Sequence, residues 1–350
     1  MSRHKCLILG ASGIVGQRLQ QRLLHHPMFE ICAVAGSKAT AGANLATLPW
    51  RLDEPRPELP NLEVLHANDD QLALECQKMG ITIAFSGLPA AVAKDVESRL
   101  VTAGIMVFSN ASAFRRVTGI PMIIPEVNPN HIIESMHYCA TNCTLIPLAI
   151  PVAAINQLTK IKSIKMRSEQ ALSGAGWELL SNPEAITGRV NPHIEGEAEK
   201  TKSELLYVNG TLNAGQITPA SIPTDIKCRR ISRRDGHQVF VEIEVYHEFT
   251  LAELHNAVDS ITCLDLPSAP IKPIHIVDKI DPKAHLWSDG VEFTSQPRPA
   301  TNLKTGMAII MGDIAISGNR ICFSAYSHNT IRGAAGGVIL LAEFILANKF

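Results

Sequence analysis

This sequence lacks an excess of charge of either sign. Lys and Arg number 32, Asp and Glu number 33, and the formal net charge of the 350 residues is -1. Electrostatic binding of nucleic acid needs a basic excess, so we expect no nucleic-acid partner. With a hydrophobic share of 46%, the composition is typical of a soluble globular protein.

Paired cysteines, a secretory leader and a long apolar run are also lacking. The eight cysteines have no regular spacing and include no Cys-x-x-Cys pair. We therefore expect reduced thiols, no disulfide and a cytoplasmic location. The longest apolar run, Leu145 to Ile155, contains Pro147 and Pro151 and is too short to cross a bilayer, so we expect no membrane partner.

A glycine-rich turn near the N-terminus follows a short apolar run, Lys5 to Leu9, and precedes a segment with helical periodicity. Strand, glycine turn and helix are the order of a dinucleotide-binding unit, in which the helix N-terminus faces a pyrophosphate. A tight turn without a ligand would also use glycine. The candidate cofactor residues of this turn are Gly10, Ser12, Gly13, Ile14 and Val15.

The next apolar run, Phe29 to Ala35, predicts the second strand and ends at Ser37 and Lys38 instead of an acidic residue. An acidic residue here would bind the ribose hydroxyls of NAD and repel a 2′-phosphate, whereas serine and lysine can bind that phosphate. The ending favours NADP as cofactor. The alternative is that Lys38 is an ordinary surface charge.

Two further βα units follow, with strands predicted at Ile81 to Leu88 and at Ile105 to Phe108. Ligands of open α/β sheets collect at the carboxyl ends of the strands, so Ser86 and Gly87 are predicted to line the cleft. The connection from Leu48 to Leu65 is rich in proline and charge and is predicted to be irregular.

The pattern changes beyond Cys143. Lys160 to Ala171 and Gln238 to Phe249 alternate between apolar and polar residues, which predicts half-exposed strands of an antiparallel or mixed sheet. A helix is predicted from Leu251 to Ile261, capped by Thr250. We expect an α/β protein with a Rossmann-type parallel-sheet domain and an α+β catalytic and oligomerisation domain with a mixed sheet. Their expected bounds are 1–141 with 328–350, and 142–327.

Cys143 is a candidate nucleophile. It stands at the start of an apolar helical run, where backbone N–H groups are expected to lower the thiol pKa and to hold an oxyanion. The alternative is a free cysteine that fills core volume.

Six motifs then occur in order: Gly10 to Gly16, Pro125 to Pro129, Asn142 to Thr144, Gln170 to Gly176, Asp235 to His237, and Asn329 to Gly336. Through them the chain resembles the aspartate-β-semialdehyde dehydrogenase family, in particular its archaeal and fungal branch. The resemblance spans Lys5 to Glu343. It implies NADPH-dependent reductive dephosphorylation of L-4-aspartyl phosphate to L-aspartate 4-semialdehyde, for lysine, threonine and methionine biosynthesis.

The resemblance also implies roles for individual residues. Cys143 would form a thioester, His237 would act as general acid and base, and Gln170 would orient the acyl group. The substrate would be bound by Arg230 at its carboxylate, by Glu197 at its ammonium group, by Arg115 and Lys200 at its phosphate, and by Asn142. Further cofactor contacts are implied at Ser173, Gly174 and Asn329. No metal is implied, and a homodimer or homotetramer is expected.

Several positions depart from the family pattern. Thr141 replaces the usual proline before the Asn-Cys pair, Arg233 and Arg234 add charge before Asp235, and Asp313 stands near an expected arginine. Two alternatives therefore stay open. One is an acyl-CoA reductase resembling malonyl-CoA reductase, which uses the same cysteine thioester. The other is a catalytically silent NADP-binding regulatory protein.

Overall fold

The first part of the chain forms a parallel sheet. The computed structural model describes residues 3–348; residues 1–2 and 349–350, which the expected domain bounds include, lie outside the described residues. Within that range six strands pair in the order β3-β2-β1-β4-β5-β6, all parallel. They are β1 (His4–Leu9), β2 (Phe29–Gly36), β3 (Val64–His66), β4 (Ile83–Ser86), β5 (Met106–Ser109) and β6 (His137–Cys139). This is the strand order of dinucleotide-binding folds, so the expected Rossmann-type sheet is confirmed.

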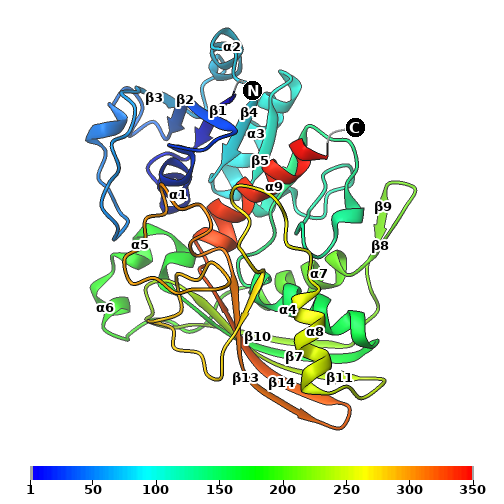
Figure 1. Cartoon of the computed structure of the whole chain (residues 1–350). Coiled ribbons are helices and arrows are strands. Elements are labelled where there is room, and N and C mark those ends of the chain that lie inside the picture. Colours follow the sequence, from blue (N-terminus) through cyan, green and yellow to red (C-terminus); the bar gives the residue numbers. More distant parts are fainter. Residues whose placement is uncertain (1–2, 349–350) are drawn as a thin grey trace.

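Helices cover both faces of this sheet. α1 (Ile14–Leu23) and α9 (Gly336–Ala347) pack on one face, and α2 (Leu72–Lys78) and α3 (Ala90–Thr102) pack on the other. Because both faces are buried, the central strands are apolar along most of their length instead of alternating. Figure 1 shows α9, in red, beside this sheet, so the C-terminal segment returns to the first part of the chain.

The second sheet is mixed, as expected. In the described part of the chain it has six strands in the order β10-β7-β11-β14-β13-β12, with parallel pairs at β10·β7 and β12·β13. Its strands are β7 (Ile161–Gln170), β10 (Thr224–Arg230), β11 (His237–Val245), β12 (Ile274–Ile276), β13 (Ile309–Ser317) and β14 (Arg320–Ser327). The alternation read from the sequence located β7 and β11.

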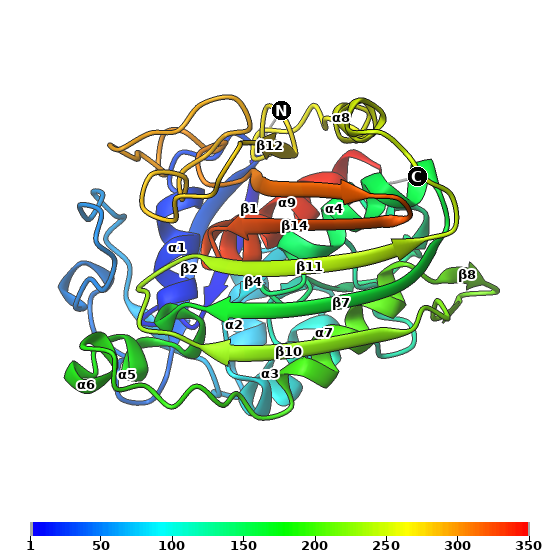
Figure 2. The ribbon, with the colours of Figure 1, turned by 90° about the horizontal axis from the view of Figure 1, so that it is seen from below.

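One face of the second sheet packs against helices, and Figure 2 shows the opposite face toward the viewer. α4 (Ile146–Leu158) contacts the centre of the sheet, α7 (Glu197–Val208) packs on β10, and α8 (Leu251–Asp259) packs on α4. α4 continues through both Pro147 and Pro151. Shorter elements complete this part: α5 (Trp177–Leu180), α6 (Pro183–Ile186) and the hairpin β8 (Thr211–Asn213) with β9 (Gln216–Thr218).

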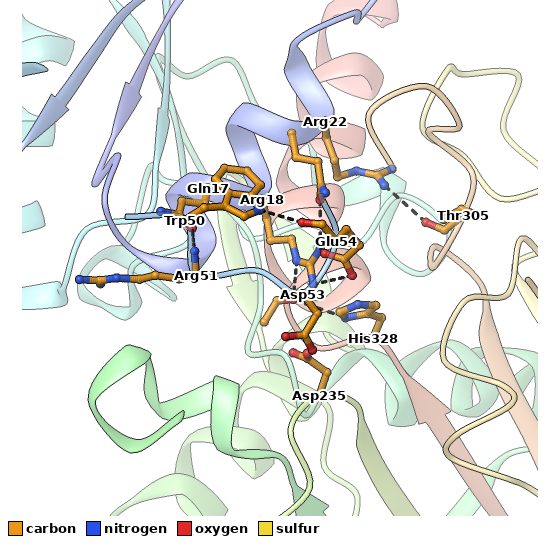
Figure 3. A network of polar contacts seen from close by, with 12 residues as sticks. Gln17, Arg18, Arg22, Trp50, Arg51, Asp53, Glu54, Asp235, Thr305 and His328 are labelled. Carbon is orange, nitrogen blue, oxygen red and sulfur yellow. Dashed lines mark hydrogen bonds and ion pairs between the residues drawn. The ribbon is translucent and has the colours of Figure 1, made fainter. Parts of the chain in front are cut away.

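Polar contacts join α1 to segments distant in sequence (Figure 3). Arg18 forms an ion pair of 2.5 Å with Glu54, on the proline-rich connection, and its Nε lies 3.2 Å from Thr330 Oγ1. The guanidinium of Arg22 donates to the carbonyl oxygens of Leu303 and Thr305. The segments around 54, 303 and 330 are therefore tied to one helix. The domain bounds stay a prediction.

None of the helices in residues 3–348 has both the length and the apolar character that are needed to cross a membrane.

The turn before β11 requires glycine at position 236. Gly236 has φ +91°, and a Cβ there would lie 1.9 Å from Tyr326 Oη. Its N–H donates to Asn329 Oδ1 at 2.7 Å, which joins this turn to the end of β14. The turn sets where β11 begins, and therefore where His237 lies.

We predict that Gly236→Ala lowers the melting temperature more than Gly215→Ala does. Gly215, in the β8–β9 turn, has a similar φ of +78° and nothing within 4 Å of its added Cβ. Both variants carry the cost of a positive φ, about 1–2 kcal/mol; only Gly236→Ala adds overpacking, about 1–3 kcal/mol. Thermal unfolding followed by circular dichroism measures the difference, and equal melting temperatures would contradict the steric argument.

Candidate active site

One edge of the second sheet collects several candidate side chains. Gln170 ends β7 and pairs in register with Arg230, which ends the parallel strand β10. His237 begins the antiparallel strand β11, opposite Ser327 at the end of β14. Strands that run in opposite directions bring their opposite termini to one edge. The sheet topology therefore brings Gln170, Arg230 and His237 together, and Asn329 follows two residues after β14.

Cys143 reaches this edge on the loop that follows β6. Its side chain is half-buried, and the neighbouring Asn142 and Thr144 are buried. The turn Ile331–Ala335 before α9 packs against it, since a Cβ on Gly333 would lie 2.7 Å from Cys143 Cβ. Segments from both parts of the chain therefore surround the thiol.

Glu197, the first residue of α7, organises the polar groups near Cys143. Its Oε1 accepts hydrogen bonds from Asn142 Nδ2 at 3.0 Å, Gln170 Nε2 at 3.1 Å and Thr144 Oγ1 at 3.3 Å. Its Oε2 accepts none from residues 3–348. The carboxylate is thus held in a defined orientation with one oxygen left for a ligand.

His237 and Arg230 share the backbone of residue 171. Arg230 Nη1 donates to Ala171 O at 2.6 Å, and Ala171 N–H donates to His237 Nδ1 at 3.1 Å. A Cβ on Gly174 would lie 2.9 Å from His237 Nε2 and 3.0 Å from Arg230 Nη1. Only glycine fits between these two side chains.

The imidazole of His237 is neutral. Burial lowers its pKa to about 3, and the positive charge of Arg230 adds to the shift. Because Nδ1 accepts a hydrogen bond from a backbone N–H, the neutral ring carries its proton on Nε2. Nε2 is buried and has no partner among the described residues, so it is a donor available to a ligand. The pKa therefore lies below the near-neutral value expected from the sequence, and the acid and base role of His237 stays a prediction.

Burial raises the pKa of the Cys143 thiol to about 12, and Glu197 adds to the rise; Arg115 and Arg230 oppose it. The expected lowering by a helix start is therefore wrong. α4 begins only at Ile146, and the Thr144 N–H donates to Asn142 Oδ1 at 2.7 Å. A side chain thus occupies this donor of the loop.

A second carboxylate of α7, which no sequence motif singled out, lies behind the Cys143 loop. Glu204 is buried; its Oε2 accepts the Asn142 N–H at 2.6 Å and its Oε1 accepts Arg115 Nη1 at 3.0 Å. The spacing of seven residues from Glu197, which is two helical turns, is the signal that could have identified it. Lys200 is exposed on the same helix and lies outside the hydrogen-bonded cluster.

The candidate cofactor residues form a second group at the carboxyl edge of the first sheet. A Cβ on Gly10 (φ +82°) would lie 2.9 Å from Gly87 O, and one on Gly87 would lie 3.2 Å from Val15 Cγ1. Ser12, Gly13 and Ile14 lead into α1, while Ser86 ends β4. Ser37 and Lys38 are exposed on the turn after β2. At the other sheet, Asn329 Nδ2 donates to Ser173 Oγ at 2.9 Å, next to Gly174.

Known proteins match this chain along nearly its whole length. Residues 5–135 match the family model for the NAD-binding domain of semialdehyde dehydrogenases. An aspartate-semialdehyde dehydrogenase of Archaeoglobus fulgidus is 33% identical over 99% of both chains, and one of Aspergillus fumigatus is 30% identical over 97% of this chain and 96% of the relative. This chain belongs to the aspartate-semialdehyde dehydrogenase family. It is therefore an oxidoreductase.

Solved structures of the family share the fold. The crystal structure of aspartate-semialdehyde dehydrogenase from Candida albicans with NADP superimposes with a TM-score of 0.79 at 28% identity, covering 99% of each chain. A second aspartate-semialdehyde dehydrogenase structure, from Vibrio cholerae, gives a TM-score of 0.73 at 17% identity over the full length of both chains. The two-sheet architecture is therefore common to both.

The residues that depart from the pattern of aspartate-semialdehyde dehydrogenases each have a defined environment in the structure. The Thr141 hydroxyl is buried with no partner among residues 3–348. Arg234 Nε lies 2.5 Å from Asp53, and the Arg233 guanidinium lies over the Tyr326 ring. Asp313 has φ +55° at an irregularity of β13. The two added arginines are therefore partnered, and the Asp313 N–H donates to Asp278 O at 2.9 Å.

No cluster of three or more His, Cys, Asp or Glu side chains in the described range is arranged to hold a metal ion, and all eight cysteines are free.

We predict that Glu197→Gln accelerates alkylation of Cys143 by iodoacetamide at about pH 8. Removing the negative charge lowers the thiol pKa, and each unit of lowering raises the thiolate fraction about tenfold. In the wild type the rate should rise about tenfold per pH unit from about pH 7 to 9 without a plateau, because the pKa of about 12 lies far above that range.

Mass spectrometry of the Cys143 peptide measures the rate and separates this thiol from the other seven. Glu199→Gln, on the exposed side of the same helical turn, is the control and should leave the rate unchanged. An equal or slower rate in Glu197→Gln would show that Glu197 does not hold the thiol pKa up.

Proposed function

We propose that this chain catalyses the NADPH-dependent reductive dephosphorylation of L-4-aspartyl phosphate to L-aspartate 4-semialdehyde through a thioester on Cys143. The observation that carries the proposal is the grouping of a thiol, a neutral histidine, Arg230 and an oriented carboxylate at one sheet edge, with Arg115 held by Glu204 behind the Cys143 loop, in a member of this family. The product would serve lysine, threonine and methionine biosynthesis.

The charges of the site complement those of aspartyl phosphate. The Arg230 guanidinium would bind the α-carboxylate, and its planar fork suits that group. Glu197 Oε2, which no described residue occupies, would accept from the α-ammonium. Arg115 would bind the phosphate, with exposed Lys200 contributing at long range. The acyl carbon would then lie toward the Cys143 thiol, with Gln170 and Asn142 beside it.

The Cys143 sulfur attacks the acyl carbon, the bond from that carbon to the phosphate oxygen breaks, and the thiol proton leaves with the phosphate. Hydride addition to the thioester carbon gives a thiohemiacetal alkoxide. Its collapse releases the aldehyde and the thiolate, which takes up one proton. Through both steps Nε2–H of His237 would donate to the acyl oxygen as negative charge develops there.

The residues at the first sheet fit a dinucleotide. Gly13 caps α1 with an extended backbone and no side-chain cap, and the first turn of α1 contains no acidic residue that would repel a phosphate. NADPH, when bound, would supply the hydride, and NADP would accept it in the reverse direction. We propose that the Gly10 turn, Ser86, Gly87, Ser173, Gly174 and Asn329 hold it, and that Ser37 and Lys38 bind the 2′-phosphate.

Other expectations stay predictions. The face of the second sheet opposite α4 carries half-exposed Phe240 and exposed Arg167, whose guanidinium carbon lies 3.9 Å from the Phe240 ring centroid. Burying such a face is one route to the expected homodimer or homotetramer. The cytoplasmic location rests on the unpaired cysteines.

The purified chain should form NADPH from aspartate semialdehyde, NADP and phosphate, and the rate should depend on phosphate or arsenate. Cys143→Ser should lower kcat by about 10³-fold or more, because the covalent step is lost. Cys263→Ser, at an exposed cysteine, is the matched control and should retain activity.

The same panel separates the alternatives. Oxidation of NADPH by malonyl-CoA, without phosphate-dependent turnover of aspartate semialdehyde, would replace the proposal by an acyl-CoA reductase. Full activity of Cys143→Ser would remove the thioester mechanism for any substrate. No turnover with either substrate would favour the regulatory alternative.

A further inference from the structure

Glu204 connects two parts of the candidate site that no other described side chain joins directly. It lies on α7 two turns beyond Glu197 and is only 2% exposed. One oxygen accepts the backbone N–H of Asn142 at 2.6 Å, and the other accepts Arg115 Nη1 at 3.0 Å. The residue that precedes the nucleophile and the guanidinium that would bind phosphate are thus held by the same carboxylate.

The orientation of Arg115 depends on few contacts. Its Nη2 donates to Asn110 O at 2.8 Å, and its Nε is buried with no acceptor among the described residues. One backbone carbonyl and one carboxylate therefore set the direction of the guanidinium. Without Glu204 a single neutral hydrogen bond would remain to orient it.

A carboxylate suits this place for a chemical reason. Asn142 N–H and Arg115 Nη1 are both donors, so their common partner must accept at both of its atoms. An ionised Glu does so, whereas a Gln turns an N–H₂ group toward one of the two donors. The same two contacts supply the hydrogen bonds that a buried charge requires.

We propose that Glu204 is a positioning residue that couples phosphate recognition at Arg115 to the placement of Cys143. The inference rests on the proposed function, in which Arg115 binds phosphate and Cys143 attacks the acyl carbon. Glu204 touches neither substrate nor thiol and acts through Arg115 and the Asn142 backbone. Movement of the guanidinium on phosphate binding is transmitted through the carboxylate to the loop that carries the nucleophile.

The competing explanation is a buried ion pair that only stabilises the fold, and the chain offers a matched control for it. Glu343 in α9 is 0% exposed and likewise accepts from one side chain and one backbone N–H, His26 Nε2 at 2.7 Å and Ser268 N at 3.0 Å. Neither His26 nor Ser268 is a residue of the candidate site. Glu343→Gln therefore reproduces the loss of a doubly bonded buried carboxylate.

In steady-state assays, Glu204→Gln should raise the KM for phosphate about tenfold or more, since an interaction that orients a charged group is lost. The KM for aspartate semialdehyde should change less. Glu343→Gln should lower the melting temperature and leave both KM values within about twofold. Glu204→Asp, which keeps the charge but cannot reach both donors, replaces Glu204→Gln should that variant not fold.

A second measurement does not depend on turnover. Alkylation of Cys143 by iodoacetamide should be about threefold faster or more in Glu204→Gln, because the released loop exposes the thiol. Phosphate should slow alkylation of the wild type, and half-protection of the variant should need a higher phosphate concentration. When Arg115 is already replaced by Ala, adding Glu204→Gln should no longer change the phosphate concentration that gives half-protection. It should still accelerate alkylation of Cys143.

Equal phosphate KM and equal alkylation rates for the wild type and Glu204→Gln would overturn the proposal. The proposal would also be overturned if Glu343→Gln changed the phosphate KM and the alkylation rate as much as Glu204→Gln does. The effect would then come from lower stability of the fold. If phosphate neither supports turnover nor slows alkylation in the wild type, the proposed function fails. The alkylation rate of Glu204→Gln then decides whether Glu204 positions Cys143.

Discussion

The loop that carries Cys143 is held by the carboxylates on one face of α7, and the candidate site depends on this constraint. Glu197 and Glu204 are two turns apart, so they present their oxygens to the same loop. Five donors from Asn142, Thr144, Gln170 and Arg115 meet these carboxylates. A hydrogen bond to a charged group contributes about 1.5–3 kcal/mol, and leaving such a group buried and unpaired costs more. The conformation of the loop is therefore largely set by its hydrogen bonds to the Glu197 and Glu204 carboxylates of α7.

The two sheets approach each other through the C-terminal segment. α9 packs on the first sheet, and the turn before it brings Gly333 against Cys143. Nη2 of its neighbour Arg332 donates to both carboxylate oxygens of buried Glu126, at 2.7 and 2.8 Å, in the loop before β6. The same α1 that begins at the glycine turn is tied by Arg18 to Thr330. The carboxyl edge of the first sheet thus faces the edge where β7, β10 and β11 meet.

Elements with local signals could be predicted from the sequence, and elements that depend on distant partners could not. The alternation along β11 and the capping box of Thr250 with Glu253 are contained in a few neighbouring residues, and both are confirmed. The short strands β3, β6 and β12 have three residues each and exist because a neighbouring strand pairs with them. Among site residues, motif order brought out Cys143 and His237, whereas Glu204 resembles any helix charge until its donors are seen.

The pKa of Cys143 shows why the local pattern misled. Free N–H groups near a helix start are expected to lower the pKa of a cysteine there. Here Asn142 Oδ1 accepts the Thr144 N–H, and Glu204 accepts the Asn142 N–H. These two donors hold the loop in place, and burial raises the thiol pKa by more than the remaining Cys143 N–H lowers it. In the free protein at neutral pH, Cys143 is therefore protonated and weakly nucleophilic. In the proposed complex the substrate ammonium would offset the Glu197 charge, which is the second cause of the raised pKa after burial.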